Sequence, residues 1–240
     1  MDDQNVSMDA PEASGTAAPS DPGPLGRIMG VFFKPKQTFE SMRERPRFLL
    51  ALILAAVVQL GIASLVVSSG IARDEAIAKL EAQGADQTKI DAVEKFMDSP
   101  VAPVFTVVTA VVAVGFGIVA GAALLFFMGN LMLGGRLQFR HYVCAVAFGW
   151  VVMLVDNVVR ASLILAKHGY DVRLGLGNLF GEDVGFGVRA LDAVTDPLLL
   201  WSTAITALAV SVFAKKGFGF GVIAVLPGFV IGAVLQGMGR

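Results

Sequence analysis

Apolar and polar residues follow one another along this chain in long blocks, and the longest apolar block sets the interpretation. It runs from Val101 to Leu133, 33 residues without a charged side chain, between Asp98 and Arg136. About 20 apolar residues are enough to cross the hydrocarbon core of a bilayer, whereas a helix on the surface of a soluble domain would carry a polar face. The block therefore predicts a transmembrane helix with length to spare for tilt.

Four further blocks have the same character, and polar segments separate them. The sequence thus predicts an all-α fold: a polytopic membrane protein with five transmembrane helices, preceded by a short amphipathic interfacial helix pair. Asp196 stands directly before the fourth span and is placed to cap its first turn. The predicted spans are residues 48–71, 101–133, 142–166, 197–214 and 217–238, in a membrane domain of residues 48–238 with extracytoplasmic loops at 72–100 and 167–196.

The segment before the first span, residues 25–47, is short, basic and half apolar. Apolar residues recur at helical spacing from Leu25 to Phe32, and Pro35 breaks this pattern and can open a second short helix. We interpret the segment as a helix pair lying on the anionic cytoplasmic leaflet. The alternative is a helix packed under the bundle, and both can hold. The basic residues expected at the membrane surface are Arg27, Lys34, Lys36, Arg43, Arg45 and Arg47.

Residues 1–24 differ from the rest of the chain because they carry five acids and no long apolar run. They predict a disordered cytoplasmic tail. Lysine and arginine are densest in the short segments that share a side with this tail, which favours a cytoplasmic N-terminus. With five spans the C-terminus is then extracytoplasmic. We expect a multi-pass protein of the bacterial inner (plasma) membrane.

Composition excludes several classes of function. The chain is 55% hydrophobic with a mean hydropathy of +0.69 and a net charge of -1, so it has no basic field for nucleic acid. Cys144 is the only cysteine, which excludes an intrachain disulfide and a cysteine-based metal cluster. His141 and His168 fall at opposite ends of one span and cannot share a metal. We therefore predict no catalytic residue, no metal, no cofactor and no enzyme activity.

Charged and amide side chains inside the third span are the main candidates for chemistry. They are Asp156, Asn157 and Arg160; Asn130 in the second span is a weaker candidate. Ionisable groups at membrane depth are costly and suggest function. Asp156 and Arg160 are four residues apart, so they share a helix face and can pair. We favour a structural ion pair that fixes helix register over a polar site facing a cavity.

Small residues at four-residue spacing predict close helix contacts. Gly117 and Gly121 form a G-x-x-x-G pattern in the second span, and Gly228 and Gly232 form another in the fifth. We expect packing inside the bundle rather than dimerisation.

Three stretches carry a resemblance to a known family. Together they span roughly Val31 to Gly237 and are similar to the bacterial branch of the Yip (Ypt-interacting protein) domain family. The resemblance implies a five-span fold with a cytoplasmic N-terminus. Eukaryotic relatives contact Rab-type GTPases, but residues 1–30 lack that branch's signature, so this contact is not carried over. The stretches are Lys34–Phe39 followed by Pro46, Leu133–Arg140 leading into the third span, and Leu191–Trp201 followed by a span, a Lys-Lys turn and a last span.

These observations lead to one preferred function and one alternative. We expect a non-enzymatic integral membrane protein that organises the membrane or binds a lipid or membrane-protein partner, and a homo-oligomer would fit this role. The alternative is a small transporter or channel in which Asp156 and Arg160 line a polar path. In both cases the lipid bilayer is a partner and nucleic acid is not.

Overall fold

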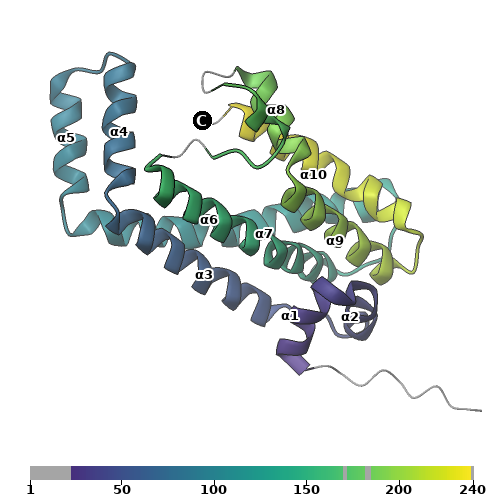
Figure 1. Cartoon of the computed structure of the whole chain (residues 1–240). Helices are drawn as coiled ribbons and strands as arrows, with labels where there is room; N and C mark the ends of the chain where they lie inside the picture. The colour runs from purple at the N-terminus through teal and green to yellow at the C-terminus, as the bar shows by residue number, and fades with distance from the viewer. Residues whose placement is uncertain (1–22, 170–171, 182–184, 239–240) are drawn as a thin grey trace, which may run out of the picture.

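The computed structural model describes residues 23–169, 172–181 and 185–238, and all regular structure within them is helical (Figure 1). The predicted disordered tail therefore lies outside the described residues, except that the first helix already begins at Gly23. The elements are α1 (Gly23–Phe33), α2 (Pro35–Met42), α3 (Leu49–Ser68), α4 (Ile71–Ala82), α5 (Gln87–Met97), α6 (Val101–Phe126), the π-helix η1 (Phe127–Met132), α7 (Phe139–Lys167), the 3-10 helix η2 (Leu176–Leu179), α8 (Phe186–Thr195), α9 (Pro197–Ala214) and α10 (Phe218–Met238).

Five of these elements are long and apolar enough to cross a membrane, which confirms the predicted fold class. They are α3, α6 continued by η1, α7, α9 and α10. The third span begins at Phe139, three residues before its predicted start, because hydropathy marks the apolar part of a helix while backbone hydrogen bonding continues into polar residues such as Arg140. The chain is a multi-pass membrane protein.

Large apolar side chains cover the outside of the bundle. Leu49 and Ile53 on α3, Val112 and Phe116 on α6, and Leu226 on α10 are all exposed. A soluble monomer rarely exposes apolar surface on this scale. In a bilayer the same side chains contact lipid tails, so the exterior of these helices is the lipid-facing surface.

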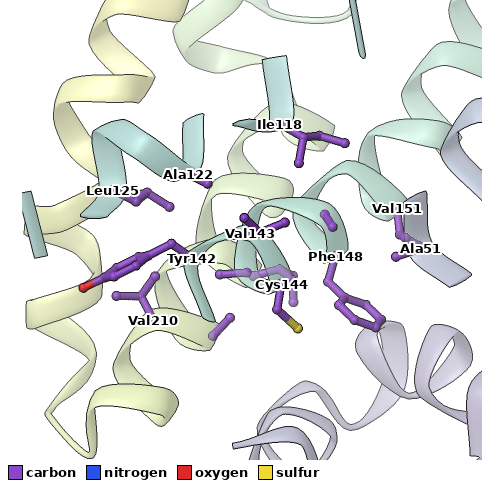
Figure 2. Packing of buried hydrophobic residues seen from close by; sticks show 14 of the residues in the cluster. Ala51, Ile118, Ala122, Leu125, Tyr142, Val143, Cys144, Phe148, Val151 and Val210 are labelled. Atoms are coloured by element: carbon purple, nitrogen blue, oxygen red, sulfur yellow. The ribbon is translucent and has the colours of Figure 1, made fainter. Parts of the chain in front are cut away.

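Helix α7 is the centre of the bundle and packs against α3, α6 and α9. Nearly every residue from His141 to Val152 is buried, and many are small, including Ala145 and Gly149. Small residues let neighbouring helices approach closely. Figure 2 shows the larger core residues around α7, with Tyr142 lying towards α6 and Phe148 directed towards the N-terminal helices. A helix buried on all sides in this way sets the position of its neighbours.

Two groups of short elements lie at opposite ends of the bundle (Figure 1). At one end, called here the α2 end, α1 and α2 pack against α7 and α9, near the turn that joins α9 to α10. At the other end, the α8 end, α8 packs against α10, and α4 and α5 form a hairpin. The hairpin turns at Gly84, whose φ is +67°. Helix α8 lies within residues 167–196, which we predict as a loop from the sequence.

The glycine patterns differ in what they contact. A Cβ on Gly117 would lie 3.5 Å from Trp150, and one on Gly121 would lie 3.4 Å from Val146, so both glycines face α7. In the fifth span, a Cβ on Gly228 would lie 3.3 Å from Leu124 of α6, whereas Gly232 has open space beside it. Three of the four glycines therefore lie at helix contacts within the bundle.

The contact between α9 and α10 provides a test of this packing. A methyl group on Gly221 would overlap the backbone carbonyl of Ala207 and the hydroxyl of Ser211, whereas one on Gly219 would meet open space. We expect Gly221→Ala to lower the free energy of unfolding by about 1–3 kcal/mol through overpacking. Gly219→Ala, the matched control, should be neutral or slightly stabilising. Denaturation in detergent micelles followed by circular dichroism measures both, and equal midpoints would show that α9 and α10 are not this close.

Candidate functional site

The polar centre of the bundle is Arg160 on α7, which joins three segments of the chain. Its Nε donates to both carboxylate oxygens of Asp156, at 2.8 and 3.1 Å. One terminal nitrogen donates to the carbonyl oxygen of Val172 at 3.0 Å, and the other pairs with the carboxylate of Asp196. We call Asp156, Arg160 and Asp196 the Arg160 cluster. The structure thus brings together two of the three residues singled out in the third span, Asp156 and Arg160, and adds a second carboxylate.

Local structure explains how these side chains meet. Asp156 and Arg160 lie one turn apart on the same face of α7. Asp196 is the N-cap of α9: its Oδ1 accepts from the backbone N–H groups of Leu198 and Leu199, at 2.9 and 3.1 Å. This confirms the predicted cap. The other oxygen of the same carboxylate is then left to bind Arg160, so one aspartate both caps α9 and ties it to α7.

The cluster is removed from solvent and holds more negative than positive charge. The side chains of Asp156 and Asp196 are 3% and 2% exposed, and that of Arg160 is 13% exposed. Burying such charges is unfavourable unless ionic and hydrogen bonds satisfy them. Here Nε and both terminal nitrogens of Arg160 have acceptors within the chain. The arrangement suits a structural tie, and Asn157, which is half-buried, lies outside its hydrogen bonds.

A second layer of polar contacts organises the segment between α7 and α9. Asp192 on α8 is buried and accepts a hydrogen bond from the backbone N–H of Gly175 at 2.8 Å. Burial raises the pKa of Asp192 above its ordinary value, and the bond from Gly175 and the charge of Arg160 act against this shift. Arg173 donates to the carbonyl oxygens of Gly177 and Gly181, each at 3.0 Å. Among the described residues, these bonds hold residues 172–181 together and join them to α8.

Asn130 closes the turn between η1 and α7. Its amide donates to the carbonyl of Leu137 at 2.7 Å, and its side-chain oxygen accepts from the Leu137 N–H at 3.1 Å and from the Tyr142 hydroxyl at 2.8 Å. The π-helical turn brings Gly129 against this hydroxyl, where a Cβ would overlap it. All these contacts are within the chain, so Asn130 shapes the turn.

The N-terminal helix pair is docked on the bundle by one face and exposes another. Val31, Phe39 and Met42 are fully buried, and the Phe39 ring lies 5.9 Å from Phe148 and 5.8 Å from Phe213, edge to face in both cases. The apolar residues spaced from Leu25 to Phe32 lie on one broad side of α1. Ile28 and Phe32 on this side pack against the core, while other apolar residues beside them face outwards.

Those outward residues form a stripe at four-residue spacing on α1. They are Leu25, Met29 and Phe33, which are 75%, 57% and 75% exposed, and we call them the α1 stripe. Around it the basic residues divide into two groups. Arg27 is only 6% exposed, because α1 turns it away from the surface. The others are exposed or half-exposed: Lys34, Lys36, Arg43, Arg45 and Arg47.

A cavity of about 430 Å³ lies beside these helices at the α2 end. Its walls come from α1, from the segment between α2 and α3, from the start of α3 and from α7. The lining residues are Pro24, Arg27, Pro46, Arg47, Phe48, Leu49, Leu50 and Phe148. The cavity thus combines apolar walls with two arginines.

Metal-binding geometry is not found in the part of the chain that the structure describes: no group of three or more His, Cys, Asp or Glu side chains there could hold an ion. Cys144 is buried within α7, where a thiol packs as a small apolar group.

Comparison with known proteins gives one finding. The Yip1 domain family matches residues 29–237, which include every span and the helix pair α1–α2 except for its first residues. No curated protein and no solved structure matches the chain significantly.

The Arg160 cluster predicts a large effect for one of its carboxylates. Asp196→Ala removes both the α9 cap and a partner of the buried guanidinium. It should lower the free energy of unfolding by about 3–5 kcal/mol. Asp98→Ala is the control, because Asp98 is 59% exposed in its 3.1 Å pair with Arg73 and should contribute at most about 1 kcal/mol. Denaturation in micelles compares the two, and equal losses would contradict a tie between α7 and α9.

Proposed function

The chain belongs to the Yip1 domain family, whose members are generally non-enzymatic membrane proteins, and we propose that it organises one leaflet of its membrane through the α1–α2 helix pair. The single observation that carries this proposal is the exposed α1 stripe, held by a helix pair whose opposite face is docked on the bundle.

Interfacial helices bind membranes through buried apolar area and through attraction between basic residues and anionic lipids. The α1 stripe supplies the apolar area, and Lys34 and Lys36 supply exposed charge beside it. An isolated amphipathic helix would lie at a depth in the leaflet that its own apolar and polar faces determine. Here the rings of Phe39, Phe148 and Phe213 fix the helix pair to the spans, so the stripe enters the leaflet at a set depth and displaces lipid locally.

Charge at the two ends of the bundle supports a cytoplasmic location for the α2 end. Arg136, Lys215 and Lys216 lie in the short connections at this end, and Arg140 lies in the first turn of α7, together with the basic residues of the helix pair. The α4–α5 hairpin at the other end carries more acids than bases. The positive-inside rule then places α1 in the cytoplasmic leaflet. We further propose that the protein belongs to the bacterial branch of the family and lies in the inner membrane.

A transporter or channel is the second candidate, and the observation that favours it is a buried cluster with two carboxylates and one guanidinium within reach of the spans. Against it, the nitrogens of Arg160 bind acceptors of the chain itself. The transport hypothesis requires that Asp156→Asn abolish solute flux into proteoliposomes while the protein stays folded. The structural hypothesis requires that this change leave permeability unaltered.

The α1 stripe can be tested in proteoliposomes that contain a phospholipid spin-labelled near its headgroup. We expect the protein to change the order of this label, and a variant with Leu25→Ser, Met29→Ser and Phe33→Ser to lose at least half of the change, because these side chains supply the apolar area that enters the leaflet. Because these three side chains are exposed and not part of the core, the bundle should stay folded, and circular dichroism can verify this.

The control variant carries Gln37→Ser and Glu40→Ser, two exposed polar positions on α2. It should behave like the unaltered protein. If the stripe variant also changed lipid order as much as the unaltered protein does, the proposed role of α1 would be wrong.

A further inference from the structure

We propose that the cavity at the α2 end is a binding site for one anionic phospholipid, which places its phosphate at Arg27 and Arg47 and its first chain segments against the apolar wall. This goes beyond the proposed function, because it requires only that the α2 end lie at a membrane surface and not that the α1 stripe reorder lipid.

The size of the cavity fits part of such a lipid. At about 430 Å³ it lies within the range of roughly 300–1,000 Å³ that is usual for small-molecule sites. A two-chain phospholipid is larger than this. The headgroup and the adjoining part of one chain would therefore enter, while the rest of the lipid stays in the bilayer.

The charge of the cavity selects an anion. Among the described residues that line it, the charged ones are Arg27 and Arg47, and both are cationic. A guanidinium group binds phosphate through paired, charge-assisted hydrogen bonds. Because Arg27 is 6% exposed, water screens its charge less than it would at the surface. Each arginine also has an interaction within the chain. A phosphate would therefore share or displace that partner, and it would be attracted by the charge and position of the two arginines.

The apolar wall leads from the arginines to the lipid-facing surface. Phe48, Leu50 and Phe148 line the cavity, and they are buried or half-buried. Leu49 lines it too but is 70% exposed, as the first residue of α3.

From Leu49 an apolar track continues along one face of α3 through Ile53 and Val57, which follow at four-residue spacing and are both exposed. An acyl chain can leave the cavity along this track without crossing water. A free phosphate would gain nothing from this wall, which is why we commit to a phospholipid.

Native mass spectrometry of the full chain tests the site. The protein is reconstituted with equal amounts of phosphatidylglycerol and phosphatidylcholine, extracted in a mild non-ionic detergent, and its retained lipid is counted. We expect one phosphatidylglycerol per chain in preference to phosphatidylcholine. Arg47→Gln should lower this retention by roughly tenfold, the usual scale for one hydrogen bond to a charged group.

Two further variants separate the site from its surroundings. Arg45→Gln is the matched control, since Arg45 is an exposed arginine two residues away that does not line the cavity, and it should retain lipid normally. Leu50→Trp fills the cavity without changing charge and should also lower retention, by tenfold or more. Circular dichroism verifies that each variant is folded.

Three outcomes would overturn the proposal. They are equal retention of the two lipids, equal retention by the Arg47→Gln and Arg45→Gln variants, and stabilisation by inorganic phosphate alone as strong as that by phosphatidylglycerol. The result is independent of the α1 stripe experiment: retention that depends on Arg47 without any change in lipid order would support the site and contradict the proposed function.

Discussion

The hydrocarbon core of the bilayer surrounds the spans as their solvent, and this is the constraint on which the structure depends. A backbone in the bilayer core must satisfy its own hydrogen bonds, so five segments of the chain are long apolar helices. Their outer faces need no polar cover, and specific contacts must then hold the helices together. Small residues on α7 allow close approach, and the Arg160 cluster adds a charged tie between α7 and α9. Both features place the strongest contacts at the helix that the others surround.

The same constraint divides the molecule into two ends with different chemistry. At the α8 end, Asp196 joins α9 to the Arg160 cluster, and Asp192 accepts a hydrogen bond from the backbone of Gly175. At the α2 end, aromatic contacts fix a basic helix pair beside the bundle, and the cavity with two arginines lies next to it. The buried charges at the first end have partners within the chain, and we propose that they hold α7 and α9 together. The second end presents apolar and basic groups outwards, and the proposed interactions with lipid are therefore located there.

Much of this fold could be predicted from the sequence, and the remainder depends on contacts between distant segments, which local sequence patterns do not predict. The apolar blocks identify the spans because lipid requires uninterrupted apolar residues. The pairing of Asp156 with Arg160 is visible because both lie on one helix face, whereas Asp196, 36 residues further on, becomes a partner only through packing. The spacing of Asp192 and Asp196 before Pro197 could have indicated a short helix with both carboxylates on one side. The burial of Arg27 depends on how α1 docks, which no local pattern encodes.

The placement of the α2 and α8 ends on opposite faces of the membrane is the claim on which the proposed function depends. It is tested most directly by labelling intact cells with a membrane-impermeant thiol reagent, after replacing buried Cys144 with serine and introducing one cysteine at exposed Gln37 on α2 or at exposed Gln83 beyond α4. We expect the cysteine at 83 to be labelled from outside, and the one at 37 to be labelled only after the membrane is opened. Labelling of both positions from the same side would contradict it.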